Sequence, residues 1–452
     1  MRPMDPRGAR LSAWFRALEE ATSAFLAEND QRHKPAPGRP ALPPISADGL
    51  GFEHALKVAV EALTRHGVAP TRPGFFAYVP GGSVPAAAFG DFIAALTNRS
   101  GALASNGPGA VSMDNQILEW MVRVIGLPPE TAWGALVSGS SIGAAMAFAA
   151  ARERLGGVDR ERAVVYLSDQ GHASIPRALR FIGMGDARVR TLPATAEQRL
   201  DPELLAAHIA ADRRAGHHPW LIVATAGTTS TGAVDPIADV ARVARAHAVW
   251  LHVDGAYGGL FALADVPALD GIGGADSLTV DVHKTLSIPH GTGAVLLREG
   301  RHLREAFGYG DTPYLDGTFG VELHSPAHYG PELTRHNRAV RLWLALHAHG
   351  TAPFRAILER CLELARSAHR VLAADPRLVT AGPPDLSTIA FRHVDGDDAT
   401  ARLMAGLNDP EREFHVSGTR LHGRRYIRVC ILSFRTDEGH VTRLLEDIDA
   451  LL

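Results

Sequence analysis

The sequence, of 452 residues, has few cysteines and no long apolar run. Its two cysteines, Cys361 and Cys430, cannot cross-link a protein of this size and give no sign of an oxidising compartment. No uninterrupted apolar run approaches the ~18 residues of a membrane-spanning helix, and the arginines near the amino terminus lack the apolar core of a signal peptide after them. We therefore expect a cytoplasmic protein with no membrane partner.

The sequence also lacks an excess of charge, because 46 Lys and Arg residues face 49 Asp and Glu residues, and the net charge is -3. Since no basic block stands out, attraction to a nucleic-acid backbone would be weak, and we expect no nucleic-acid partner. The composition, 46% hydrophobic and 21% charged, is that of a globular protein, and the length suits a large domain and a smaller one.

Lysine is scarce in this arginine-rich chain, where Lys34, Lys57 and Lys284 are the only examples. Because arginine is the usual cation here, a lysine between apolar segments requires a specific reason. Lysine can lose its proton and form an imine with an aldehyde, whereas arginine cannot. Lys284 follows the apolar stretch 277–280, so it is the first candidate for a catalytic lysine.

Asp254 ends another apolar stretch, residues 250–253. Short apolar runs without alternation indicate buried parallel strands, and the carboxyl ends of such strands form the usual ligand edge of an open sheet. We expect Asp254 and Lys284 at one such edge. A lysine that binds an aldehyde and an acid that keeps a pyridine nitrogen protonated together indicate pyridoxal 5'-phosphate (PLP). Either residue alone is more often a turn cap or a solvated group.

A phosphate site is predicted in residues 138–144, Ser-Gly-Ser-Ser-Ile-Gly-Ala, which precede an alanine-rich helix. Small residues at the start of a helix leave backbone N–H groups free, and the hydroxyls of Ser140 and Ser141 add donors aimed at the same point. A dinucleotide-binding loop is the rival interpretation, but the Gly-x-Gly-x-x-Gly spacing is incomplete.

Residues 252–259, 275–277 and 281–284 resemble the group II PLP-dependent amino-acid decarboxylases, the family of aromatic-L-amino-acid and glutamate decarboxylases. The last segment, Asp-Val-His-Lys, departs from the family's usual Pro-His-Lys at Val282. The resemblance extends from about residue 75 to the end of the chain. It implies an α/β fold-type-I PLP enzyme, similar to aspartate aminotransferase, with a large domain on a mostly parallel sheet and a small C-terminal α+β domain.

The resemblance also implies roles for single residues. Lys284 would hold the cofactor, Asp254 would pair with the pyridine nitrogen, and His172 would stack on the pyridine ring as the third catalytic residue. The other matching cofactor contacts are Ser140, Ser141, Thr225, Ala256 and His283, and the matching substrate-pocket residues are Tyr78, Val79, Pro80 and Gly81.

Residues 307–330 are rich in Gly, Pro, Tyr and His and have no hydrophobic period, which is typical of a functional loop. The family has a mobile loop here with a tyrosine that protonates the α-carbon after carbon dioxide leaves, and the candidates are Tyr309, Tyr314 and Tyr329. His324 and His328 have helical metal-ligand spacing, but a proline lies between them and no third ligand is evident, so no metal is predicted.

Three regions are expected along the chain. Residues 1–72 form an N-terminal arm and connector, with an amphipathic helix from 11 to 27 and another helix from about 52 to 66. Residues 73–345 form the PLP-binding large domain, and residues 346–452 form the small domain. The apolar face of the first helix has no evident partner nearby in the sequence, and the resemblance makes this region a dimerisation arm, so we expect a homodimer.

The expected activity is decarboxylation of an L-amino acid to its amine and carbon dioxide through an imine at Lys284. Pocket geometry selects the bond that breaks in a PLP enzyme, so decarboxylation-dependent oxidative deamination, transamination and carbon–carbon cleavage are alternatives in the same site. A nicotinamide (NAD)-dependent dehydrogenase and a non-catalytic PLP-binding protein are two further alternatives. The sequence does not reveal which amino acid is the substrate.

Overall fold

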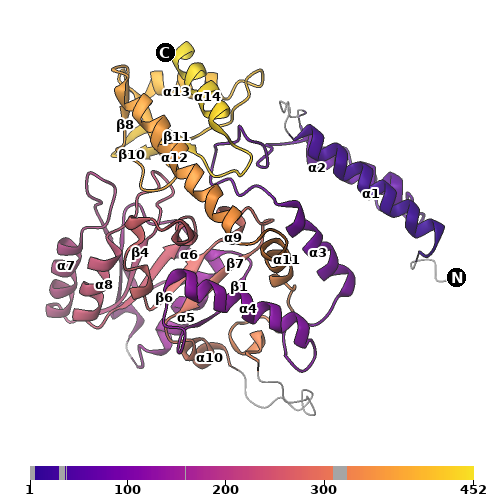
Figure 1. Ribbon diagram of the computed structural model, residues 1–452. Coiled ribbons are helices and arrows are strands. Elements are labelled where there is room, and N and C mark those ends of the chain that lie inside the picture. The colour runs from indigo at the N-terminus through magenta and orange to yellow at the C-terminus, as the bar shows by residue number, and fades with distance from the viewer. Residues whose placement is uncertain (1–5, 30–35, 37, 158, 309–322) are drawn as a thin grey trace.

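The protein, a computed structural model, is described over residues 6–29, 36, 38–157, 159–308 and 323–452. Figure 1 shows a large sheet with helices around it, a smaller sheet beside it, and two helices, α1 and α2, that project from this body. Within the described residues, no helix combines the length and the apolar character needed to cross a membrane.

The large sheet has seven strands in the order β1-β7-β6-β5-β4-β2-β3. Its strands are β1 (Trp133–Val137), β2 (Ala163–Ser168), β3 (Arg188–Leu192), β4 (His218–Thr225), β5 (Trp250–Gly255), β6 (Ser277–Val280) and β7 (Gly293–Leu297). The pairs among β2 to β6 are parallel, and β7 is antiparallel to both β6 and β1. The predicted, mostly parallel sheet is confirmed, and the carboxyl ends of β1, β4, β5 and β6 share one edge.

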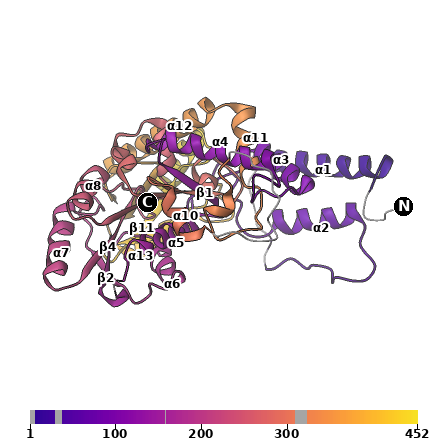
Figure 2. The ribbon, with the colours of Figure 1, turned by 90° about the horizontal axis from the view of Figure 1, so that it is seen from below.

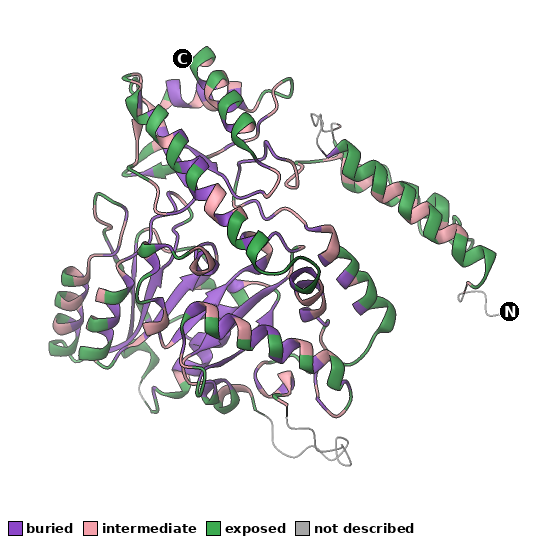
Figure 3. Cartoon of the chain, in the orientation of Figure 1, coloured by how far each residue is buried: buried purple, intermediate pink, exposed green. Residues whose placement is uncertain are grey.

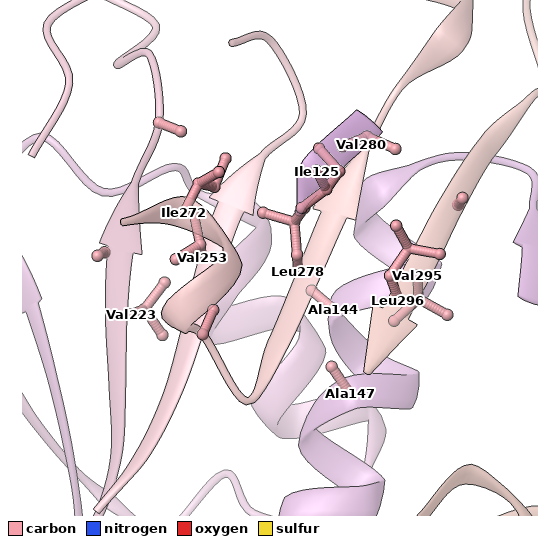
Figure 4. Close-up of a cluster of buried hydrophobic side chains, with 14 of the residues drawn as sticks. Ile125, Ala144, Ala147, Val223, Val253, Ile272, Leu278, Val280, Val295 and Leu296 are labelled. Atoms are coloured by element: carbon pink, nitrogen blue, oxygen red, sulfur yellow. The ribbon is translucent and has the colours of Figure 1, made fainter. Parts of the chain in front are cut away.

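Helices cover this sheet and bury its strands. Against it pack α4 (Pro108–Ile125), α5 (Ser140–Glu153), α7 (Pro202–Arg214) and α8 (Ile237–Ala246). A β-carbon at Gly143 would lie 2.8 Å from Cγ2 of Thr279, so the glycine lets α5 approach β6 closely. Figure 4 shows Ala144 and Ala147 of α5 beside Leu278 and other strand side chains. Small side chains on the helix and branched ones on the strands therefore make a dry contact.

The smaller sheet is antiparallel, with the order β10-β11-β9-β8. Its strands are β8 (Leu378–Thr380), β9 (Thr388–His393), β10 (Ser417–Leu421) and β11 (Arg424–Cys430), and α13 (Asp397–Leu407) and α14 (Glu438–Leu451) pack with it. The long helix α12 (Ala352–Ala374) contributes Leu358 to the core of the large sheet and Leu372 to that of the small sheet. One helix thus joins both cores, and the predicted division at residues 345 and 346 stays a prediction.

The predicted N-terminal helices are confirmed as α1 (Ala9–Glu28) and α2 (Phe52–Arg65). They pack side by side, with the rings of Trp14 and Phe52 stacked 4.2 Å apart (Figure 2). Neither helix has a buried residue, as the green and pink ribbon of Figure 3 shows. The remaining α-helices of the described residues are α3 (Pro85–Thr97), α6 (Ser174–Phe181), α9 (Val282–Thr285), α10 (Arg301–Phe307) and α11 (Ala339–His349).

Candidate active site

The predicted catalytic residues meet at the edge where β4, β5 and β6 end. Asp254 lies near the end of β5 and is paired in register with Thr225, the last residue of β4. Lys284 lies on the one-turn helix α9, which follows β6. A single cleft is lined by Val79, Ser140, Ser141, His172, Thr225, Asp254, Ala256, Asp281 and Lys284, among others. The fold therefore brings together residues from six separate segments of the chain.

Lys284 forms an ion pair with Asp281, a residue for which the sequence predicts no role. Its Nζ lies 3.0 Å from Oδ2 of Asp281, whose side chain is buried. The other oxygen of Asp281 accepts hydrogen bonds from the backbone N–H of Ser140, at 2.7 Å, and from its hydroxyl, at 2.8 Å. The start of α5 thus stabilises the carboxylate, and the carboxylate holds the lysine at the cleft.

This contact changes the expectation for the phosphate site. Both donors of Ser140 were expected to be free, but both bond to Asp281, because a carboxylate and a phosphate suit the same donors at a helix start. The other predicted phosphate contacts are Ser141, which also lines the cleft, and His283. The assignment of these residues to a phosphate stays a prediction.

His283 is held in one orientation beside Asp281. Its Nδ1 donates to the carbonyl oxygen of Thr292 over 2.7 Å, and its Nε2 lies 3.8 Å from Oδ2 of Asp281. Burial lowers the pKa of His283, and the carboxylate of Asp281 opposes this effect. The imidazole is therefore neutral near pH 7, with its Nδ1 proton committed to the backbone.

Asp254 and His172 line the same cleft in different surroundings. Asp254 is 7% exposed, and its Oδ1 accepts the backbone N–H of Ala256 at 3.1 Å. Among the described residues no Lys, Arg or His forms an ion pair with it. His172 is exposed, and its Nδ1 accepts the backbone N–H of Ser174 at 3.2 Å, which orients the ring at the start of α6. A buried carboxylate without a cation suits a protonated ring nitrogen.

The predicted substrate-pocket segment, Tyr78 to Gly81, packs against the loop that carries the lysine. A β-carbon at Gly81 would lie 1.7 Å from the carbonyl oxygen of His283, so only glycine allows this contact. Val79 lines the cleft, Pro80 and Gly81 are buried, and Tyr78 is 64% exposed with a φ of 54°. The segment borders the cleft, and its role in binding substrate stays a prediction.

Two of the three candidate tyrosines, Tyr309 and Tyr314, lie outside the described residues. Tyr329 is buried, its hydroxyl lies 2.6 Å from Nδ1 of His324, and the ring of His324 stacks on Trp133. Because Trp133 begins β1, this cluster lies at the sheet edge opposite the cleft, so Tyr329 does not face Lys284 of its own chain. The described residues contain no His, Cys, Asp and Glu group arranged to hold a metal ion.

Comparison with known proteins supplies the family. The conserved domain of the pyridoxal-dependent decarboxylases matches residues 53–394, most of the chain. The protein belongs to this decarboxylase family. The resemblance predicted from the sequence is thereby confirmed, as are the PLP cofactor and the assignment as a carboxy-lyase. The match does not favour the dehydrogenase or the non-catalytic binding protein.

Individual relatives of this decarboxylase cover most of its length. An aromatic-L-amino-acid decarboxylase of Bacillus atrophaeus is 32% identical over 391 residues, which are 84% of this chain and 81% of the relative. The 4-hydroxyphenylacetaldehyde synthase of Rhodiola rosea is 28% identical over 392 residues, 82% of this chain and 79% of the relative. A crystal structure of Oryza sativa TDC with PLP and tryptamine has a TM-score of 0.91 and 25% identity, covering 100% of this chain and 99% of that one. The fold-type-I architecture is confirmed.

The cleft of this decarboxylase fits PLP by the chemistry of its donors. Lys284 is the lysine within reach of the cleft, and Asp254 is a buried carboxylate without a cation among the described residues. Exposed His172 and half-buried Ala256 border the space beside Asp254. Lys284 therefore suits the aldehyde of PLP, Asp254 suits its pyridine nitrogen, and His172 and Ala256 suit its flat ring.

Arg428 of β11, which no motif in the sequence singles out, lies beside the cleft. Its side chain donates to the carbonyl oxygens of Tyr78 and Thr229 and, at 3.3 Å, to the hydroxyl of Ser417. It is 3% exposed, and its Nη2 is buried without a hydrogen-bond partner among the described residues. An arginine in a strand of an arginine-rich chain carries no local signal, so only the docking of the small sheet identifies it.

Proposed function

We propose that this decarboxylase releases carbon dioxide from an L-amino acid with an uncharged side chain and leaves the amine. One observation carries the proposal: Nζ of Lys284 lies 3.0 Å from Asp281, at the same sheet edge as the buried carboxylate of Asp254. A cation that can shed its proton and a carboxylate that keeps its charge are the two groups that PLP chemistry requires from a protein.

We assign the remaining roles by position. PLP, when bound, supplies a sink for the electrons that carbon dioxide leaves behind. Lys284 attaches the cofactor and moves protons at its Nζ, Asp254 keeps the pyridine nitrogen protonated, and His172 packs on the ring. Ser141 would hold the phosphate, with Ser140 and His283, whose donors bond to Asp281 and Thr292, beside it. Thr225 and Ala256 would lie beside the ring, and the segment from Tyr78 through Val79 and Pro80 to Gly81 would border the substrate.

The substrate class follows from the charges of the cleft. The charged or titratable lining residues are His172, Asp254, Asp281 and Lys284, which each have a role already, and Tyr257, whose buried hydroxyl bonds to Ser387. The rest of the described surface is uncharged and includes Val79, Gln170 and Thr229, so no spare charge there would offset a charged side chain. The Bacillus atrophaeus relative, an aromatic-L-amino-acid decarboxylase, points to the same class.

A substrate panel tests this proposal. The holoenzyme is incubated with L-tryptophan, L-tyrosine, L-phenylalanine, L-leucine, L-glutamate and L-2,4-diaminobutyrate, and products are identified by mass spectrometry. We expect carbon dioxide and the amine from one or more of the four uncharged substrates. Turnover confined to glutamate or diaminobutyrate would refute the substrate class, and an aldehyde with ammonia would move the enzyme to the reaction type of the Rhodiola rosea relative.

Arg428 is the residue we expect to hold the substrate carboxylate. Its unpaired Nη2 is a buried donor, and a guanidinium binds a carboxylate through paired hydrogen bonds. Arg428→Lys keeps the charge but loses the fork, so KM should rise about tenfold or more while kcat falls less. Steady-state kinetics measure both. An unchanged KM with a lowered melting temperature would show that Arg428 only braces the Tyr78 and Thr229 carbonyls.

A tyrosine of the segment 307–330 is expected to protonate the α-carbon, because the carbanion needs a proton once carbon dioxide leaves. Tyr309→Phe or Tyr314→Phe should either abolish turnover or divert the product from the amine to the aldehyde, with dissolved dioxygen as the oxidant and ammonia and hydrogen peroxide as the other products. Tyr329→Phe is the matched control, since its hydroxyl bonds to His324 at the far edge of the sheet. Product ratios measured by mass spectrometry decide, and unchanged rate and product in all three variants would refute the role.

We propose that the enzyme is a homodimer. Helices α1 and α2 extend beyond the body without a buried residue, and the neighbouring helix α3 exposes Phe89, Phe92, Ile93 and Leu96. Apolar surface of this kind is costly in water and is typical of an interface.

The two cysteines are both free, which supports a cytoplasmic location, and cell fractionation would test it.

Removing residues 1–44 should lower both the dimer fraction and the retention of PLP, because the deletion takes away α1 and the connector. Light scattering gives the mass and absorbance gives the cofactor content. Phe92→Asp should also weaken the dimer, while Phe181→Asp, at a phenylalanine on α6 that is still more exposed, should not. A full-mass dimer in the deletion variant would contradict the assignment of α1 to the interface.

A further inference from the structure

A second cavity, of about 800 Å³, lies at the amino-terminal edge of the large sheet, opposite the cleft that contains Lys284. We name it the amino-edge cavity; the first residues of β4 and β5, the end of α5, and helices α8 and α10 surround it. This volume is that of a small-molecule site. None of the residues assigned to the reaction lines it, so the reaction does not account for it.

The charge of the amino-edge cavity is mainly positive. Four arginines line it, Arg154, Arg245, Arg298 and Arg301, against the carboxylates of Asp276 and Glu299. Arg301 lies 3.5 Å from Glu299, which offsets its charge. In the part of the chain that the structure describes, no carboxylate forms an ion pair with the other three arginines. The lining therefore holds three guanidinium groups without a direct ion pair, and the single carboxylate of Asp276, which interacts at longer range with Arg298 and Arg154, offsets only part of their charge.

Hydrogen bonds hold two of these guanidinium groups in place without neutralising them. Arg298 donates to the backbone carbonyl oxygens of Gly273 and Ala275. Nη1 of Arg154 lies 3.2 Å from Nε2 of His302, and Nδ1 of His302 lies 2.8 Å from Glu305. Because Nδ1 donates its proton to Glu305, Nε2 accepts from Arg154. These arginines are thus oriented and still carry a full charge toward the cavity.

The other walls of the cavity are apolar and flat. The rings of Trp220 and Trp250 form part of them, with Leu155 and Val249. Both indole N–H groups are already bonded, that of Trp220 to the carbonyl oxygen of Ala151 and that of Trp250 to the hydroxyl of Ser277. The rings therefore offer carbon surface to a ligand and are fixed before it binds.

From these two properties we propose that the amino-edge cavity binds a small organic anion, a carboxylate or phosphate ester carried on a flat apolar body. Arg154 and Arg245 bind the oxyanion, because a planar guanidinium fork matches both kinds of oxyanion. Trp250 and Leu155 contact the body. Since α5 and β5 run from this cavity to Ser140 and Asp254, the occupant also touches two elements that position the cleft.

The test measures binding of the fluorescent aromatic anion 1-anilinonaphthalene-8-sulfonate to the holoenzyme. Arg154→Glu and Arg245→Glu should each raise its Kd about tenfold or more, which corresponds to the loss of one charge-assisted contact. Arg242→Glu is the matched control: it makes the same charge change one turn away on α8, at an exposed residue paired with Asp239. Its Kd should stay near that of the unchanged protein.

Competition identifies the ligand class. Adenosine monophosphate and indole-3-acetate are added to the complex with the fluorescent anion, and displacement by the first favours a phosphate ester and by the second a carboxylate. Inorganic phosphate, which has no apolar body, should displace far less. Equal Kd values in the Arg154→Glu, Arg245→Glu and Arg242→Glu proteins would overturn the proposal, as would displacement by neither organic anion or equal displacement by inorganic phosphate. Turnover and melting temperature verify that each variant is folded.

Discussion

Replacing Lys284 with alanine should abolish covalent attachment of PLP and reduce turnover by at least about a thousandfold, because no other amine lines the described cleft. Borohydride reduction followed by peptide mass spectrometry locates the attachment, and steady-state assays give the rate. The substitution also leaves Asp281 without its cation at 3.0 Å, so loss of activity alone would not separate the covalent role from the electrostatic one.

Lys284→Arg separates the two roles. Arginine keeps a positive charge beside Asp281 but does not attach the aldehyde, so this variant should lose attachment and turnover just as the alanine variant does. Lys57→Ala, an identical substitution on the exposed surface of α2, is the control and should keep both. Reduced cofactor recovered on Lys57 or Lys34 in the unchanged enzyme would refute the assignment of Lys284.

Replacing Asp254 with asparagine should reduce turnover per bound PLP about a thousandfold or more while PLP still attaches to Lys284. The variant keeps the size of the side chain and its acceptor for Ala256 N–H, but it removes the charge that keeps the pyridine nitrogen protonated. Losing one partner of a close ion pair in a site only 7% exposed costs several kcal/mol, which converts to a rate loss of this order.

Asp201, an aspartate with a structural role, provides the control for Asp254. Asp201 caps α7, where its side chain accepts the backbone N–H groups of Glu203 and Leu204. Asp201→Asn should cost about 1 kcal/mol of stability or less and leave turnover per bound PLP intact. Turnover normalised to cofactor content, measured beside thermal unfolding, compares the two variants. If Asp254→Asn behaved like Asp201→Asn, Asp254 would have no place in the chemistry.

Local patterns were enough to predict the chemistry and the architecture. Buried parallel strands appear as apolar runs, so the runs before Asp254 and Lys284 indicated β5 and β6 and the shared ligand edge between them. The scarcity of lysine singled out Lys284, and the motifs around it were specific enough to indicate the family that the comparison confirms. The helical period of the N-terminal region likewise predicted α1 and α2.

Those local patterns did not predict contacts between segments that are distant in the sequence. Asp281 takes both donors of Ser140, Arg428 reaches Tyr78 from a strand of the small sheet, and Tyr329 lies at the sheet edge away from Lys284. A residue's type and its neighbours in sequence do not specify which distant group completes its hydrogen bonds, because that depends on how strands and helices pack. The sequence by itself determined the family, the succession of segments along the chain and the candidate lysine. The tertiary structure alone decided which charges face one another and where the arginines of β11 and of the amino-edge cavity point.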